Sequence, residues 1–171
     1  MEQGKYLGDD EMAEEYWKDL MLDGSVTLFW NNNIYEKNIE AVKAEGFDIY
    51  SFDCIKWEKD NFHKELANIL GFPAYYGENL NAFNDCLSDM IPNNKGFVLV
   101  FRNYDIFAKK YPDIAFRILD IIQINSWRFL IEGTILLGFV QSNDGKLTFP
   151  PLGGMTADWN REEWFNKNRG L

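Results

Sequence analysis

Apolar and polar positions follow two rhythms along the chain, one typical of strands and one typical of helices. Four short apolar runs, rich in β-branched and aromatic residues, predict strands. Between them, apolar residues recur every three or four positions, the spacing that buries one face of a helix. Strands alternating with helices predict an α/β fold with a parallel sheet and helices packed on it. The expected strands are 26–30, 47–52, 97–101 and 134–140, and the expected helices are 9–20, 33–45, 55–70, 79–91 and 112–124.

Length and composition favour one domain with appendages. The chain has 171 residues, of which 46 % are hydrophobic and 16 % aromatic, enough to bury a sizeable core. No apolar run reaches the ~18 residues of a membrane span, and we expect no membrane partner. No secretory signal is recognised, which favours the cytoplasm. We predict an acidic helical segment at 1–24, an α/β domain at 25–142 and an aromatic C-terminal tail at 143–171 that packs on the domain.

The charge of the chain points to a basic partner. The net charge is −10, so phosphate backbones are repelled and direct nucleic-acid binding is not expected. The charge is unevenly spread, because residues 1–24 hold eight acidic and two basic residues. The rest of the chain carries only −4, and solubility alone also accounts for the overall value.

Common catalytic and cofactor motifs are missing from the sequence. It contains no GxGxxG, GxxxxGK[ST], GxSxG or HExxH. Cys54 and Cys86 have no metal-binding or CxxC spacing and lie among apolar neighbours, which predicts buried thiols. The single histidine, His63, lies in a helical stretch, where a surface or half-buried structural role is favoured over catalysis. We therefore expect no cofactor, no metal and no enzymatic activity.

A specialised stretch lies at residues 75–91. It holds three acidic residues and no basic one, and it begins with two tyrosines, which are good interface anchors. Asn81, Asp85 and Asp89 recur every four residues and therefore share one edge of the predicted helix. An acidic edge beside aromatic residues suits a basic cleft on a partner.

The same stretch also has a purely structural interpretation. In it, Asn79 caps the helix and Gly77 adopts a turn conformation. Tyr75 and Tyr76 then pack inward, as Leu80 does on the core face of the helix. The pattern of residues alone leaves both interpretations open.

Residues 62–89 resemble a known family. Their sequence, FHKELANILGFPAYYGENLNAFNDCLSD, is similar to the signature of barstar, the intracellular inhibitor of barnase-type ribonucleases. A weaker resemblance continues past the apolar strand to Arg102, so that about 47–141 is covered. The resemblance implies a small parallel sheet with packed helices. The strand–helix unit before residue 47 and the tail after 142 would then be additions to that domain.

The resemblance implies an inhibitor that binds a basic ribonuclease or toxin one to one and plugs its active site. Asp85 would take the place of the substrate phosphate, and Tyr75 would pack on the catalytic histidine of the enzyme. Asn79 would contribute loop contacts, and Asp120 would stand for an acid that the family carries on a later helix. The expected partner-binding residues are Tyr75, Asn79, Leu80, Asn81, Asn84, Asp85, Asp89 and Asp120.

Three residues depart from the family pattern. Barstar has a second Asp where this chain has Asn81, a Trp where it has Asn84, and a further exposed Trp where it has Met90. One charge and two aromatic anchors are therefore lost. These changes favour a different ribonuclease or another basic toxin over barnase itself.

Two other hypotheses compete with inhibition. The first is a non-inhibitory protein-binding or regulatory module on the same scaffold, suggested by the lost anchors and by Trp159, Trp164 and Phe165 in the tail. The second is an enzyme of unknown type that uses carboxylates and His63.

Overall fold

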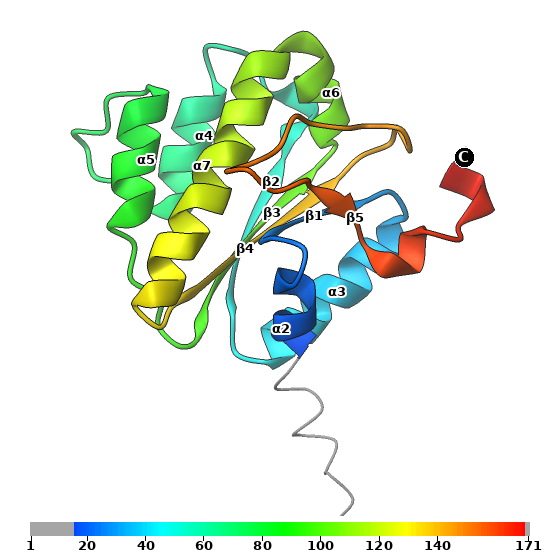
Figure 1. Ribbon diagram of the computed structural model, residues 1–171. Coiled ribbons are helices and arrows are strands. Elements are labelled where there is room, and N and C mark those ends of the chain that lie inside the picture. The colour runs from blue at the N-terminus through cyan, green and yellow to red at the C-terminus, as the bar shows by residue number, and fades with distance from the viewer. Residues whose placement is uncertain (1–15, 170–171) are drawn as a thin grey trace, which may run out of the picture.

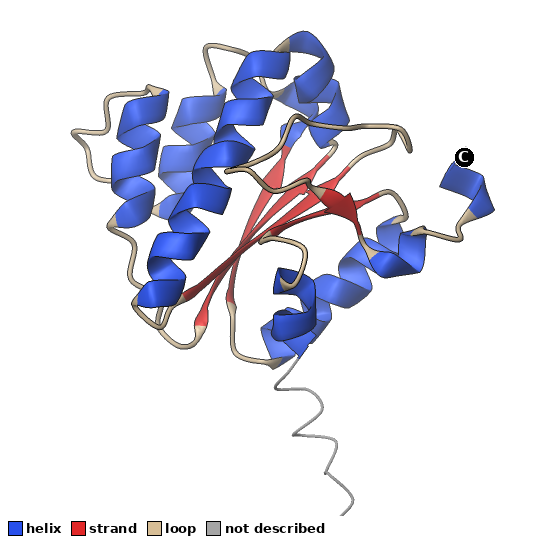
Figure 2. Cartoon of the chain, in the orientation of Figure 1, coloured by secondary structure: helices blue, strands red, loops and turns tan. Residues whose placement is uncertain are grey.

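The computed structural model describes residues 16–169 and shows a five-stranded parallel sheet with helices on both faces (Figures 1 and 2). The strands are β1 (Val26–Phe29), β2 (Asp48–Asp53), β3 (Gly96–Arg102), β4 (Ile135–Gln141) and β5 (Asp158–Trp159). They lie in the order β2-β3-β4-β1-β5, and every neighbouring pair is parallel. Strand β1, the first in the chain, thus lies between β4 and β5, the last two.

The helices form two unequal layers. They are α2 (Tyr16–Met21), α3 (Asn32–Ala44), α4 (Phe62–Leu70), α5 (Leu80–Ser88), α6 (Tyr104–Lys110) and α7 (Pro112–Ile131), with 3-10 turns at Cys54–Lys56, Arg161–Glu163 and Lys167–Arg169. Helices α4 to α7 cover one face of the sheet, and α2 and α3 lie on the other (Figure 1). Within residues 16–169, no helix has the length and apolar character needed to cross a bilayer.

The central strands β3 and β4 are almost completely buried because both of their faces are covered. The larger core lies beneath α4 to α7 and is rich in aromatic side chains. Trp57 is buried at its centre, with ring centroids 5.2 Å from Phe107 and 5.9 Å from Phe62. Phe62 opens α4, so this packing fixes the helix that precedes the 75–91 stretch.

The segment after β4 returns across the molecule to reach β5. Leu152 on the way is buried in the larger core, and Leu28 of β1 pairs with Val140 of β4 on one side and Trp159 of β5 on the other. The final residues are held by Glu163, whose buried carboxylate accepts hydrogen bonds from the amide groups that follow β1. The C-terminal segment is thereby tied to the residues that follow β1.

The predicted α/β class and parallel sheet are confirmed, and each expected strand differs from the observed one by one residue at one or both ends. Several helix boundaries were wrong. The helix expected at 55–70 begins only at Phe62, because Cys54–Lys56 form a 3-10 turn and Trp57 enters the core in an extended conformation. The helix expected at 79–91 ends at Ser88.

Helix α7 continues to Ile131, well beyond the expected end at residue 124. Its second half buries the polar residues Asn125 and Ser126, which interrupt the apolar pattern on which the prediction rested. Helix α6 and strand β5 were not predicted, since both are short. Of the helix expected at 9–20, residues 9–15 lie outside the described part of the chain.

Candidate functional site

The loop between α4 and α5 is shaped by its own backbone. Gly71 ends α4 in the left-handed region, at a φ of 69°. Asn79 caps α5, because its Oδ1 accepts a hydrogen bond of 2.8 Å from the Ala82 amide while its Nδ2 donates to the Gly77 carbonyl. Glu78 adopts a φ of 48°, which is unusual for a residue with a side chain. The start of α5 is therefore held in one position, as the predicted Asn79 cap implies.

Tyr76 anchors this loop on α4. Its hydroxyl oxygen lies 2.6 Å from Nδ1 of His63, and its ring packs 5.1 Å from that of Phe72. Burial raises the pKa of Tyr76 and lowers the pKa of His63, while the nearby Glu78 partly opposes the effect on the histidine. His63 is half-buried, and its contact with Tyr76 gives it a structural role in holding the loop.

Tyr75 behaves in the opposite way to its neighbour. Its side chain is 82 % exposed, so only one of the two tyrosines packs inward. An exposed aromatic ring on a fixed loop loses little freedom when a partner covers it, and such rings are frequent interface anchors. The structural interpretation is thus wrong for Tyr75 and correct for Tyr76.

Helix α5 separates a core face from an exposed edge. Phe83 and Leu87 are buried, and Leu80 is half-buried against the larger core. The edge made by Asn81, Asp85 and Asp89 is exposed, as their four-residue spacing predicts. Within residues 16–169, the carboxylate of Asp85 has no hydrogen bond or ion pair, so it is available to a cationic partner.

Asn84 and Asp120 are placed differently from this edge. Asn84 is half-buried, and its Oδ1 accepts a hydrogen bond of 2.7 Å from Asn125, which ties α5 to α7. Asp120 accepts a hydrogen bond of 2.6 Å from the amide of Gly153. Asp120 lies about 140° around α7 from Asn125, since successive helical residues are about 100° apart. Its carboxylate therefore faces the C-terminal segment, away from α5.

The acidic residues of α5 act on a buried thiol of the same helix. Burial and the carboxylates of Asp89 and Asp85 raise the pKa of the Cys86 thiol. Cys54, also a free thiol, has its pKa raised mainly by burial. Both cysteines are buried and unbridged, as predicted, and such thiols are poor nucleophiles.

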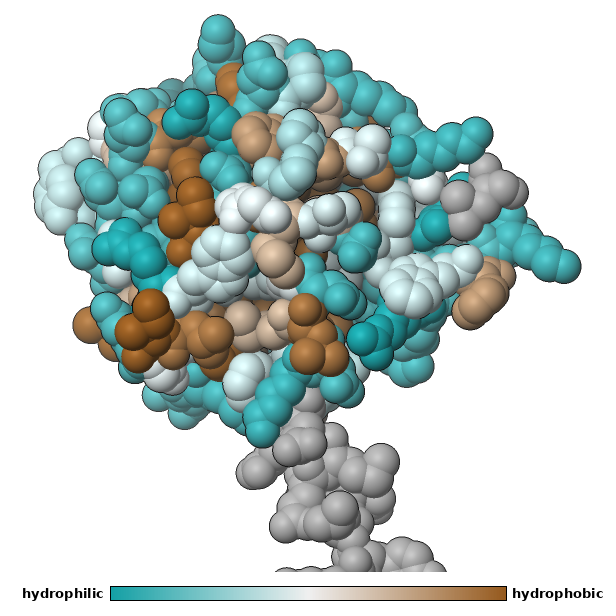
Figure 3. Space-filling view, viewed as in Figure 1, coloured by the Kyte–Doolittle hydropathy of each residue, from teal (hydrophilic) through white to brown (hydrophobic). Residues whose placement is uncertain are grey.

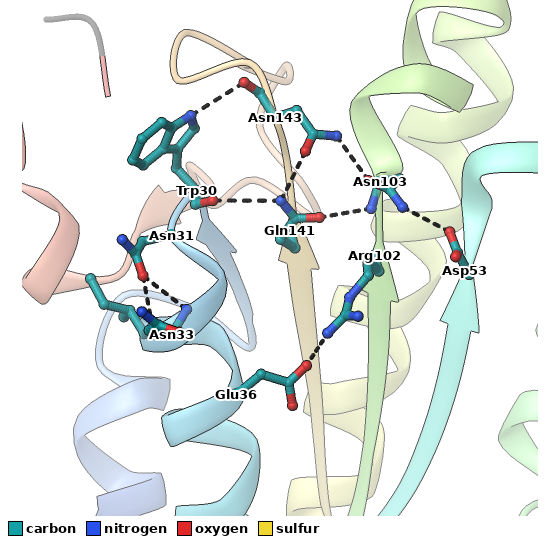
Figure 4. Close-up of polar contacts among 10 residues, drawn as sticks. Trp30, Asn31, Asn33, Glu36, Asp53, Arg102, Asn103, Gln141 and Asn143 are labelled. Carbon is teal, nitrogen blue, oxygen red and sulfur yellow. Dashed lines mark hydrogen bonds and ion pairs between the residues drawn. The ribbon is translucent and has the colours of Figure 1, made fainter. Parts of the chain in front are cut away.

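A second polar cluster, which sequence reasoning missed, lies at the carboxyl ends of the strands (Figure 4). Asn103 has a φ of 57° and donates from its backbone to Gln141 and from its side chain to Asp53. Arg102 pairs with Glu36 on α3. Ligands often bind at this edge of open α/β sheets. Here, however, these groups bond to one another across three strands, so the cluster serves to join the strand ends.

The amino end of α3 at the same edge is also occupied by the chain itself. Helix amino ends attract anions because their amide groups are unpaired. Glu163 supplies the anion, with its Oε1 3.0 Å from the Trp30 amide nitrogen and 2.7 Å from that of Asn31. Among the polar sites of residues 16–169, the loop and helix from Tyr75 to Asp89 thus combine exposure, a fixed backbone and unpaired charge.

Comparison with protein families gives a match over this region. Residues 50–130 match the family described as barstar, the barnase inhibitor. This segment, a little under half of the chain, is therefore similar to the barstar family. The matched segment includes most of β2, all of β3, helices α4 to α6 and nearly all of α7, and it therefore contains the loop and the acidic edge of α5. Strand β1 and helix α3 precede it, and β4 and β5 follow it.

The other comparisons add little. No curated protein matches the chain significantly. Among solved structures, one similar chain comes from the complex of Drosophila ORC bound to AT-rich DNA and Cdc6, at 14 % sequence identity and a TM-score of 0.41. The alignment covers 94 % of this chain and 60 % of that one. A likeness this low carries no argument about function.

Proposed function

We propose that this protein is a stoichiometric inhibitor of a barnase-type ribonuclease or a related basic toxin in the cytoplasm. It would bind its target one to one and cover the active site with the 75–91 loop and helix. It would perform no chemistry of its own and would not bind nucleic acid directly.

The exposed carboxylate of Asp85 carries this proposal. It projects from a helix that is held at its start by the Asn79 cap, underneath by the larger core and at its side by the Asn84–Asn125 hydrogen bond. A fixed carboxylate with no internal partner is matched to a cluster of cations that binds phosphate. Fixing it in advance removes part of the entropy cost of association.

The surroundings of Asp85 support the same partner chemistry. Asp89 lies one turn away and Glu78 lies at the loop, while residues 75–91 contain no Lys or Arg. An acidic surface accelerates encounter with a basic partner and excludes acidic ones. Tyr75 adds an exposed ring beside these charges for contact with a flat group of the target.

The test is RNA cleavage by barnase and by other basic microbial ribonucleases, with this protein titrated around equimolar concentration. We expect a sharp end point near one to one for the cognate enzyme. Asp85→Ala is expected to weaken inhibition by about 2 kcal/mol or more, roughly 30-fold, because the cations of the target lose their counter-charge.

Glu40→Ala provides a matched control. Glu40 is an exposed carboxylate on α3, on the opposite face of the sheet, so its removal changes the net charge equally. Inhibition by Glu40→Ala is expected to stay within about twofold of wild type. If Asp85→Ala inhibits as tightly as the unaltered protein, the proposed docking mode is wrong.

The alternative is a non-inhibitory binding module, and one observation favours it. Large apolar side chains are exposed at the carboxyl-terminal half of α7, where Figure 3 shows brown residues on a largely teal surface. The exposed residues there are Ile124, Trp127, Leu130 and Ile131, and Phe165 is 91 % exposed in the C-terminal segment. Under this alternative, Trp127→Ala or Phe165→Ala abolishes partner binding in a pull-down whereas Asp85→Ala does not.

A further inference from the structure

A hollow of about 290 Å³ opens beside the acidic edge of α5. It lies between the end of α4, the loop that follows, the end of α5 and strand β2. Since a water molecule takes about 30 Å³, the hollow has room for roughly ten waters, or for one long side chain. Its lining residues include Tyr50, Leu70, Phe72, Cys86, Met90 and Ile91, with Tyr75 and Asp89 also contributing.

The walls of this hollow are held in place independently of any partner. Leu70 is buried at the end of α4, and Phe72 packs on Tyr76, which is itself bonded to His63. On the sheet side, the ring of Tyr50 meets Phe97 edge-on at 6.4 Å. The hollow is therefore preformed, which lowers the cost of filling it.

The identity of residue 90 keeps the hollow open. Met90 is half-buried at its wall and leaves space that a larger aromatic side chain would fill. The next residue, Ile91, is 90 % exposed and extends the apolar surface outward. An aliphatic chain that enters the hollow thus meets apolar atoms along its length.

The charged groups at the hollow are of one sign. Asp89 is exposed and belongs to its lining, and Asp85 lies one turn back on the same edge of α5. Both carboxylates act on the thiol of Cys86, which also lines the hollow. Among residues 16–169, no Lys or Arg lines it. The occupant that these charges favour is a cation.

We propose that the hollow receives an arginine side chain of the target protein, with the methylene stem against Met90 and Ile91 and the guanidinium at Asp89. This inference rests on the proposed function, because it assigns a specificity pocket to the same inhibitory surface. A planar guanidinium forms paired hydrogen bonds with a carboxylate and stacks on aromatic rings. The exposed ring of Tyr75 stands ready for that stacking.

The experiment uses the whole chain and three uncharged-end tripeptides, Ac-Gly-Arg-Gly-NH2, Ac-Gly-Lys-Gly-NH2 and the norleucine equivalent, titrated to about 10 mM, a range suited to weak single-side-chain binding. Carbon-13 methyl NMR reports on Met90 and Ile91 at the hollow. Ile39, buried on the opposite face of the sheet, is the internal control. We expect saturable shifts at Met90 and Ile91 that are largest with the arginine peptide.

Three variants locate the response. Asp89→Asn is expected to weaken arginine-peptide binding about threefold to tenfold, the range for an exposed to partly buried charge-assisted contact. Met90→Trp is expected to abolish it by filling the hollow. Asp85→Asn, which removes the same charge one turn away, is expected to retain more binding than Asp89→Asn.

The proposal is overturned if the wild-type methyl groups do not respond, if norleucine binds as well as arginine, or if Asp89→Asn or Met90→Trp binds the peptide normally. It is equally overturned if lysine matches arginine or if Asp85→Asn loses as much binding as Asp89→Asn. No ribonuclease is present in this titration. If the protein inhibits a ribonuclease but does not bind the arginine peptide, the proposed function stands and only the arginine pocket is wrong. If it binds the arginine peptide but inhibits no ribonuclease, the pocket stands and the proposed function is wrong.

Discussion

Glu163→Ala tests how strongly the C-terminal segment is bound to the rest of the fold. The Glu163 side chain is completely buried, and its Oε1 accepts hydrogen bonds from the amide groups of Trp30 and Asn31 at 3.0 and 2.7 Å. Its Oε2 accepts a longer one, 3.4 Å, from the Asn166 side chain. The substitution leaves two backbone donors without an acceptor.

The expected loss of stability follows from these contacts. Each buried donor left unpaired costs about 1–3 kcal/mol, and the relief of a buried carboxylate offsets part of the sum. The net loss is therefore about 2–4 kcal/mol for Glu163→Ala. Glu163→Gln keeps one acceptor oxygen and the shape of the side chain, so about 1–2 kcal/mol is expected.

Urea unfolding followed by tryptophan fluorescence measures both losses. Glu162→Ala is the matched control, because the neighbouring carboxylate is exposed and makes a surface ion pair of 3.1 Å with Lys37. Such pairs contribute about 0–1 kcal/mol. A loss for Glu163→Ala no larger than that for Glu162→Ala would refute the view that Glu163 holds the segment.

Deletion of the C-terminal segment removes structural contacts as well as exposed side chains. Removal of residues 146–171 deletes Glu163, strand β5 and the buried Leu152 together. Loss of partner binding after that deletion would then report an altered fold. Point substitutions at exposed positions, such as Phe165→Ala, change the surface without removing these contacts.

Two further predictions concern the loop and the sheet. Burial lowers the pKa of His63 below its ordinary value of 6.5, so the unfolded chain binds the proton more tightly. We therefore expect the urea midpoint of the wild-type protein to decrease as the pH falls from 7 towards 5. The midpoint of His63→Gln is expected to decrease less over that range. If the midpoints of the two proteins fall in parallel, His63 does not cause the pH dependence. Gly96→Ala would place a Cβ 2.0 Å from the Ile135 carbonyl oxygen, so we expect the free energy of unfolding to fall by about 3 kcal/mol or more in the same urea assay. A near-native urea midpoint would show instead that β3 and β4 can separate without cost.

The fold could be predicted from the sequence where one local pattern determined each element. The run Phe97–Phe101 is wholly apolar, and it forms a strand buried on both faces. Asn79 precedes an apolar period and caps α5. The prediction ended α7 at residue 124, although the helix continues to Ile131. The Nδ2 of the buried Asn125 donates to Asn84 on α5 and to the Ile121 carbonyl of its own helix, and no local pattern reveals the contact with α5.

The candidate site could be predicted only in part. The four-residue spacing placed Asp85 and Asp89 on one exposed edge of α5. Nothing in the sequence distinguished Tyr75 from Tyr76, because the choice depends on His63, thirteen residues before Tyr76. The contact between Asp120 and Gly153 spans 33 residues, and it likewise has no local signal.

The position of β1 has a consequence for the order in which the chain can fold during synthesis. All four residues of β1 are buried, yet its partners β4 and β5 lie more than a hundred residues later. Strands β2 and β3 can pair as soon as residue 102 has been made, whereas β1 must wait for Ile135 and beyond. The apolar strand β1 therefore stays unpaired until β4 has been made, and over that interval it is exposed to association with other chains.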